Sequence, residues 1–324
     1  MKNTKKLFLI AVAALLVTGC VKVPKLENGE EVFAELDGKQ YTANELYEDL
    51  KSNYGVNSLI NLADKYIITK ELESTENEKT QAKTYIEQMK NYYESSGSSW
   101  NEVLASNGYT EASLLEYYEL SYEKETVAKN YYKSLVTDKE IDKYYNDEII
   151  GDITAKQILI IPKTTTDMSD EDKEKANTEA YNKALEVIEK LKDGKDFSEL
   201  AKEYSDDDSA SVGGTLAPFN KQSNYPEEFI NQAIALNPNE YSTKPIKSTY
   251  GYHIIYIVSK ADKPKLEDIK STIISNVADK NIEKESNYLN IAWKAIREKY
   301  KLNIYDTVVK EKYDQVMSQY KSGN

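Results

Sequence analysis

The chain has 324 residues, of which 40% are hydrophobic and 30% are charged, as is ordinary for a globular protein. This length suggests two domains, or one domain that carries an insertion. The formal net charge of -13 argues against a nucleic-acid partner, because phosphate binding needs a basic face, and the single cysteine excludes an intrachain disulfide.

The amino terminus has the pattern of a secretory signal. Three lysines within residues 1–6 precede an unbroken apolar run from Leu7 to Val17, which is too short to cross a bilayer as a helix of roughly 20 residues. The segment Leu16-Val17-Thr18-Gly19-Cys20 resembles the bacterial lipobox, and this resemblance implies cleavage before Cys20 and attachment of lipid to its sulfur. We therefore expect a lipoprotein signal peptide at 1–19 and a tether at 20–30; the alternative is a free cysteine inside a simple membrane anchor.

Residues 31–150 have mostly helical signals. Asp37-Gly38 predicts the turn of a small hairpin at the start of this stretch. Thr42, Ser99 and Thr137 are each followed three residues later by a glutamate, which is the capping-box signature of a helix start. We therefore expect an N-terminal helical segment after the hairpin.

The periodicity changes near residue 152 to that of an α+β module. ITAKQILII (153–161), YSTKPIKS (241–248) and YGYHIIYIV (250–258) predict strands, and residues 169–192, 196–205 and 226–236 predict helices. Helical spacing resumes after Pro264. Neither helical flank has an evident complete core, so we expect residues 264–324 to pack with residues 31–150.

The central module resembles the parvulins, a family of small prolyl isomerases. Four stretches carry the resemblance, in this order between residues 152 and 260: AKQILI, DGKDFSELAKEYSDDDSASVGGTLAPF, EEFINQAIALNPNEYSTKPIKS and YGYHII. With its lipobox and helical flanks, the whole chain is similar to the PrsA-type foldase lipoproteins of Gram-positive bacteria. The resemblance implies an α+β fold, in which a four-stranded antiparallel sheet with surrounding helices (152–260) is inserted into a chaperone-like helical domain.

The resemblance also implies a function: a foldase on the extracytoplasmic face of the cell membrane, held by lipid on Cys20. Its clients would be unfolded or partly folded exported proteins with X-Pro bonds. Rotation of a peptide bond meets a barrier of about 18–20 kcal/mol but breaks no covalent bond, so the reaction needs no nucleophile, metal or cofactor. The enzyme must hold the proline ring and favour the twisted amide over the planar one.

Four residues match parvulin positions that contact the substrate. Leu216, Tyr225 and Phe229 would form the apolar cup for the proline ring, although ordinary core residues would give the same pattern. Tyr225 stands where the family commonly has methionine. Asp207 matches the family's Cys-or-Asp position beside the substrate carbonyl, but within SDDDS it reads equally well as a solvated loop acid.

His253 is the only histidine of the chain. Strand alternation places it on an apolar face with Ile255, which alone would favour a core histidine. The resemblance makes it the second of two histidines beneath the bound proline, with Ser248 as the hydroxyl that orients them. Gln157 replaces the first histidine. Because glutamine can satisfy His253 by hydrogen bonding but cannot titrate, we expect an intact pocket with reduced isomerase turnover.

Other functions stay open at this point. The parvulin module could be a binding domain only, with the flanks acting as a holdase, and Gln157 favours this alternative. A solute-binding lipoprotein would need doubly wound halves, which the pattern does not predict. The tyrosine doublets of the first flank, such as Tyr117-Tyr118, suit a wet client groove, but composition alone also accounts for them. A homodimer formed through an apolar groove is a further alternative.

Overall fold

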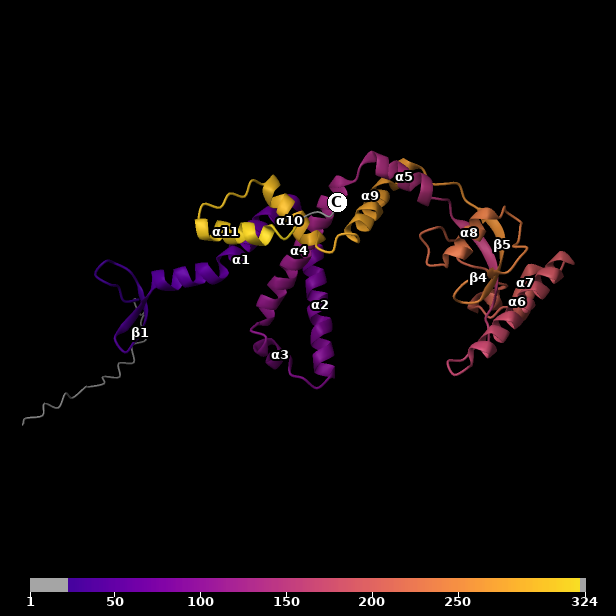
Figure 1. The fold of residues 1–324 in the computed structure, drawn as a ribbon, viewed down its shortest axis with the longest axis horizontal. Coiled ribbons are helices and arrows are strands. Elements are labelled where there is room, and N and C mark those ends of the chain that lie inside the picture. The colour runs from indigo at the N-terminus through magenta and orange to yellow at the C-terminus, as the bar shows by residue number, and fades with distance from the viewer. Residues whose placement is uncertain (1–22, 321–324) are drawn as a thin grey trace, which may run out of the picture. The chain divides into compact units, whose positions relative to one another are not determined.

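The computed structural model describes residues 23–320, so the predicted signal peptide and Cys20 lie outside the described residues. Contacts divide the chain into two compact units (Figure 1). The flanking unit consists of the described parts of residues 1–128 and 287–324, and the central unit consists of residues 129–286. Among residues 23–320, none of the helices has the length and apolar character needed to cross a bilayer.

The flanking unit begins with a hairpin and is otherwise helical. Its elements are β1 (Val32–Leu36), β2 (Lys39–Thr42), α1 (Ala43–Glu71), α2 (Glu76–Ser95), α3 (Trp100–Ser106), α10 (Tyr288–Lys299), α11 (Thr307–Met317) and the part of α4 (Glu111–Leu135) up to residue 128. The last residues of α4 belong to the central unit. The predicted hairpin turn is confirmed, because β1 pairs antiparallel with β2 and both Asp37 (φ 50°) and Gly38 (φ 80°) have the positive φ of a tight turn.

Two of the three predicted capping boxes are present. The Thr42 side chain accepts a hydrogen bond from the Glu45 backbone N–H, and the Thr137 side chain accepts one from the Glu140 backbone N–H. In both boxes the glutamate side chain accepts in return from the threonine backbone N–H. The prediction for Ser99 was wrong in its detail: Ser99 precedes α3, but its side chain makes no capping hydrogen bond.

A buried ion cluster joins segments of the flanking unit that lie far apart in the sequence. Asp64 of α1 is fully buried and accepts two hydrogen bonds from Arg297 of α10, at 2.7 and 2.8 Å. Lys124 of α4 lies 2.6 Å from the same carboxylate. The indole N–H of Trp293 donates to the Lys124 backbone carbonyl at 3.0 Å. The cluster therefore fixes α1, α4 and α10 to one another.

The central unit contains the α+β module and two further helices. Its elements are α5 (Asp138–Glu148), β3 (Ile153–Ile160), α6 (Asp170–Lys192), α7 (Phe197–Tyr204), the 3-10 helix η1 (Asp208–Val212), α8 (Glu227–Ala235), β4 (Ile246–Lys247), β5 (Tyr252–Lys260) and α9 (Leu266–Ile282). Helices α5 and α9 share a small core that includes Ile141, Tyr144, Ile273 and Val277.

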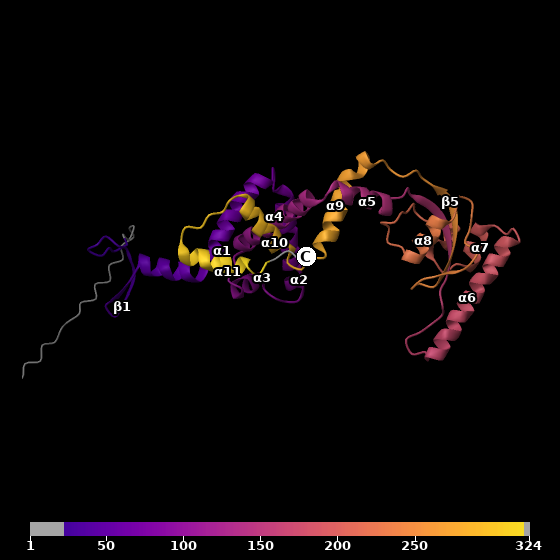
Figure 2. The ribbon, with the colours of Figure 1, turned by 45° about the horizontal axis from the view of Figure 1, so that its top comes forward.

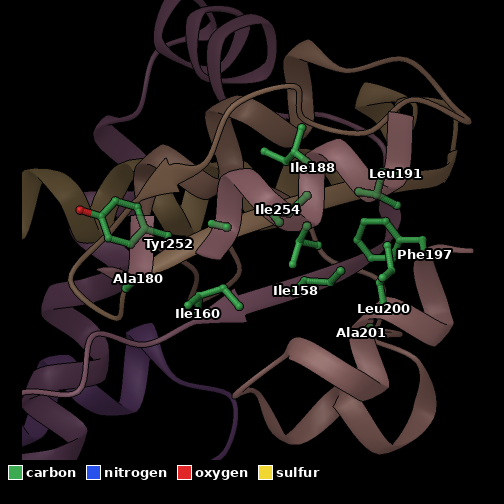
Figure 3. Close-up of a cluster of buried hydrophobic side chains, with 12 residues drawn as sticks. Ile158, Ile160, Ala180, Ile188, Leu191, Phe197, Leu200, Ala201, Tyr252 and Ile254 are labelled. Atoms are coloured by element: carbon green, nitrogen blue, oxygen red, sulfur yellow. The ribbon is translucent and has the colours of Figure 1, made fainter. Parts of the chain in front are cut away.

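The sheet of the central unit is antiparallel, with strand order β3-β5-β4. Figure 2 shows α8 on one side of β5 and α6 with α7 on the other. Ile158, Ile160 and Ile254 pack against α6 and α7 (Figure 3). Ile255 and Ile257 pack on the opposite face with α8. This separation confirms the predicted alternation along the strand, which puts His253 on the α8 face.

The sheet has three strands in the described chain, not the four that the parvulin resemblance implies. Residues 214–219 run beside β3, but they form only isolated bridges at Thr215 and Phe219. The backbone N–H groups of Phe219 and Leu216 donate to the carbonyls of Ile153 and Ala155, so three residue steps on this segment lie opposite two on β3. This extra residue is a bulge that interrupts the regular ladder.

Candidate functional site

A chain of hydrogen bonds passes through His253 on the α8 face of the sheet. The Ser248 hydroxyl lies 2.7 Å from His253 Nε2, and the Gln157 side-chain oxygen lies 3.1 Å from His253 Nδ1. The Tyr250 backbone N–H donates to the Ser248 oxygen at 3.0 Å. Because the Gln157 oxygen can only accept, Nδ1 carries the proton and Nε2 accepts from Ser248. The chain thus selects one neutral tautomer of His253.

Burial keeps His253 uncharged. Its side chain is only 3% exposed, and Gln157 is 5% exposed. Desolvation lowers the pKa of His253 to about 4, against the opposing influence of the Asp207 and Glu228 carboxylates. At neutral pH the site therefore contains an imidazole, not an imidazolium.

Two glycines allow neighbouring backbone segments to approach β3 closely at this site. A Cβ atom on Gly214 would lie 2.3 Å from the Gln157 carbonyl oxygen, and one on Gly251 would lie 2.4 Å from the Ile160 carbonyl oxygen. Both residues have positive φ, at 78° and 142°. The Gln157 backbone N–H donates a hydrogen bond to the Gly214 carbonyl at 2.8 Å. The close approach of Gly214 therefore helps to hold Gln157 in place.

An aromatic cluster lies against His253. The Phe229 ring meets the imidazole edge to face, with ring centroids 5.3 Å apart. Tyr225 stacks on Phe229 at 5.0 Å with an angle of 16° between the rings, and Phe219 lies 5.5 Å from Phe229. Leu216 is partly buried against the same cluster. The structure therefore brings together the three residues predicted for the proline cup.

Phe219 belongs to this cluster although the sequence analysis did not single it out. It is 1% exposed, and its backbone N–H and C=O both bind Ile153 of β3. The pattern gave one usable signal, an aromatic residue directly after the proline that ends TLAP, but the pairing with β3 is a long-range contact that periodicity does not predict.

Asp207 directly precedes η1 and is its N-cap residue. Its carboxylate accepts from the backbone N–H of Ser209 at 2.9 Å and from the Ser209 hydroxyl. The Ser205 hydroxyl binds the Leu159 backbone N–H at 3.0 Å, which ties this loop to β3. Burial, and then the negative charge of Asp207, raises the pKa of Tyr225, so the carboxylate acts on both Tyr225 and His253.

Taken together, these residues combine an aromatic cluster with the neutral hydrogen-bonding groups of His253, Gln157 and Ser248. Within residues 23–320 there is no cluster of three or more His, Cys, Asp or Glu side chains that could bind a metal ion. The site is thus composed of aromatic rings, one neutral imidazole, one amide, one hydroxyl and one carboxylate.

Comparison with known proteins identifies this part of the chain. Residues 158–259 match the family model of the PPIC-type PPIASE (rotamase) domain. The chain is 31% identical over 305 residues to foldase protein PrsA 1 of Listeria monocytogenes, with 90% of this chain and 91% of the relative covered. It is 30% identical over 274 residues to foldase protein PrsA of Bacillus subtilis, with 84% and 83% covered.

A solved structure has the same fold. The crystal structure of foldase protein PrsA from Streptococcus pneumoniae is 22% identical, has a TM-score of 0.56, and is matched over 88% of this chain and 99% of its own. The chain belongs to the PrsA foldase family and is a peptidyl-prolyl cis-trans isomerase with a PpiC-type domain.

Proposed function

We propose that this protein is a lipid-anchored foldase that isomerises X-Pro bonds in exported proteins on the extracytoplasmic face of the membrane. The observation that carries the isomerase assignment to particular residues is the Ser248–His253–Gln157 hydrogen-bond chain beside the Phe229 cluster. The anchor would be lipid on Cys20, which the lipobox pattern of residues 16–20 supports. The clients would be unfolded or partly folded chains that leave the export machinery.

In this proposal, the proline ring packs against Leu216, Phe229 and Tyr225. Burial of the ring in an apolar cup fixes its position while the rest of the client remains free to rotate about the X-Pro bond. A planar amide has more charge on its carbonyl oxygen than a twisted amide, because resonance moves electron density from nitrogen to oxygen. An apolar surface and the nearby Asp207 carboxylate both disfavour that charge, so they lower the energy of the twisted amide relative to the planar one.

His253 and its partners would keep the floor of the site fixed and neutral. Gln157 supplies the hydrogen bond that Nδ1 of His253 needs, but it lacks the second imidazole ring of other parvulins. We therefore propose that the pocket is intact and that turnover is reduced. The same replacement supports a second candidate function, a holdase whose parvulin domain binds clients without catalysis.

We further propose that residues 31–150 and 264–324 form one chaperone domain, into which residues 152–260 are inserted. The Asp64–Arg297 pair supports this layout for the flanking unit, because it joins a residue before the parvulin domain to one after it.

A refolding assay tests the proposed function. A client whose folding is limited by proline isomerisation should refold faster with the soluble form that lacks residues 1–20. A variant with Phe229→Ala should lose this acceleration while it still prevents client aggregation. Equal acceleration by both proteins would contradict the assignment of catalysis to the Phe229 cluster, and acceleration by neither would favour the holdase.

A further inference from the structure

The solvent side of the aromatic cluster is formed by Tyr225. Phe229 has no exposed surface and Phe219 is 1% exposed, whereas Tyr225 and Leu216 are only partly buried. The Tyr225 ring lies nearly parallel to the Phe229 ring at 5.0 Å and contacts the Phe219 ring at 4.9 Å. One face of Phe229 is therefore already occupied by an aromatic ring of the protein itself.

A proline ring that packs on Phe229 needs an accessible face of that ring. We infer that Tyr225 is a movable wall of the cup, which covers Phe229 in the free protein and rotates outward when an X-Pro segment binds. This inference rests on the proposed function of the site. In the free protein the Tyr225 ring then covers the face of Phe229 on which the proline ring packs, and a client proline must displace it.

The movement is confined to the Tyr225 side chain because the loop before it is anchored. Three side chains of this loop bind residues 147–152: Asn220 to the Asp152 carboxylate at 2.7 Å, Lys221 to the Asp147 carbonyl at 2.6 Å, and Gln222 to the Glu148 carbonyl at 3.0 Å. The Tyr225 backbone N–H donates to the Ser223 carbonyl at 2.8 Å. Pro226 follows directly and restricts the backbone conformations of Tyr225.

The side chain itself has fewer restraints than the loop. Tyrosine combines an apolar ring with a polar tip that can remain in water, so rotation away from Phe229 exposes no unsatisfied polar group. The main contribution lost on rotation is the stacking on Phe229 and Phe219. A client proline that takes this place restores contact with Phe229.

Such a wall lowers the apparent affinity for clients. When only a fraction of the molecules has the binding-competent conformation, the apparent dissociation constant rises by the inverse of that fraction. An aromatic pair of this kind changes an equilibrium roughly two- to tenfold. A variant with a flexible, non-aromatic side chain at position 225 should therefore bind X-Pro peptides more tightly than the unmodified chain does.

The kinetic test compares the whole chain with its Tyr225→Met and Tyr181→Met variants, using an X-Pro peptide as substrate. Tyr181 is a matched control because it is also partly exposed, at 39%, and contacts an aromatic residue, Tyr252, on the other face of the sheet. We expect Tyr225→Met to lower KM roughly two- to tenfold and Tyr181→Met to leave it unchanged. A KM for Tyr225→Met that is equal to or above that of the unmodified chain would overturn the inference.

An NMR measurement on the unmodified chain tests the movement directly. With the 5 phenylalanines isotopically labelled, the nuclear Overhauser effect between Phe229 and Tyr225 should be present in the free protein and disappear when the X-Pro peptide is saturating. Its persistence in the peptide complex would show that Tyr225 is a fixed wall. Turnover of a Phe229→Ala variant separates failure of the proposed site from failure of the movable wall. Full turnover of this variant would mean that the proposed site itself is wrong. An inactive variant, together with a Phe229–Tyr225 effect that persists in the peptide complex of the unmodified chain, would refute the movable wall alone.

Discussion

At the scale of single residues, Gln157 is the feature for which the proposed function expects the clearest consequence. Gln157 preserves the hydrogen bond to His253 Nδ1, so the geometry of the floor does not depend on a second imidazole. In the proposed function, glutamine at this position lacks a ring that would stack beneath the bound proline. Mutation of Gln157 should therefore change the turnover rate without changing the geometry of the site around His253.

Gln157→His should raise turnover, because it restores the paired imidazoles of other parvulins while it keeps a partner for His253. We expect an increase in kcat of up to about tenfold with little change in KM, which corresponds to about 1.4 kcal/mol of additional transition-state stabilisation. A peptide isomerisation assay measures both constants. If the Gln157→His variant is correctly folded and shows no gain in kcat, Gln157 does not limit catalysis.

The buried, neutral state of His253 predicts a pH dependence of stability. The pKa of His253 is lowered from about 6.5 to about 4 in the folded protein, so the unfolded chain binds the proton more tightly. The free energy of unfolding should fall by about 3 kcal/mol as pH drops from 6.5 to 4, and this contribution should be fully present above pH 6.5. Urea denaturation of the unmodified chain and of His253→Gln isolates it, since the variant keeps all the carboxylates. Parallel pH profiles for the two proteins would contradict a depressed pKa.

At the scale of elements, local signals predicted helix starts well and long-range pairings poorly. The Thr42 and Thr137 capping boxes depend on residues three positions apart, so the sequence contains all the information that they need. The irregular edge beside β3 depends on pairing between Ile153 and Phe219, which lie far apart in the chain. The role of Phe219 and the three-stranded sheet could not be read from periodicity for the same reason.

The site residues show the same division. Strand alternation alone placed His253 on the α8 face with Ile255. The grouping of Leu216, Tyr225 and Phe229 came from the parvulin resemblance, because no local pattern distinguishes these residues from core residues. The need for Gly214 was not predicted, since it arises from the approach of one segment to the Gln157 backbone.

Gly214→Ala should disturb the site more than an equivalent change elsewhere. The new Cβ would lie 2.3 Å from the Gln157 carbonyl oxygen at a φ of 78°. Gly194 has a similar φ of 81° with no atom within 4 Å of its Cβ position, so Gly194→Ala measures the conformational strain alone. We expect about 1 kcal/mol of destabilisation for Gly194→Ala and about 1–3 kcal/mol more for Gly214→Ala. Equal destabilisation in thermal unfolding would show that the close approach is unimportant.

At the scale of the whole molecule, the flanking unit depends on contacts between helices that precede the central unit in the sequence and a helix that follows it. Asp64 is fully buried and is surrounded by Arg297 and Lys124. Loss of the carboxylate charge would leave two cations without their shared partner in a buried site. The cost of such a loss is much larger than that of breaking a surface ion pair.

Asp64→Asn should therefore destabilise the flanking unit by about 3–5 kcal/mol in chemical denaturation. Glu116→Gln is the control, because it removes the Lys65–Glu116 pair, whose glutamate side chain is 66% exposed, and it should have little effect on stability. Similar costs for the two variants would mean that the buried cluster does not hold the flanking unit together.

Removal of the parvulin domain separates the two proposed activities of the molecule. If the flanks hold clients, a chain in which residues 152–260 are replaced by a short linker should still suppress aggregation of an unfolded client and should not catalyse isomerisation. Complete loss of aggregation suppression would place client holding in the parvulin domain.

In the proposed function, the cluster around Phe229, with His253 and Gln157 beside it, catalyses X-Pro isomerisation. The most direct test is the kcat/KM for cis-to-trans isomerisation of a short X-Pro peptide by the form that lacks residues 1–20, compared with its Phe229→Ala variant. We expect measurable catalysis by the first protein and a loss of at least about tenfold in the folded variant, since truncation of Phe229 removes the principal contact with the proline ring. Equal kcat/KM values for the two proteins would contradict it.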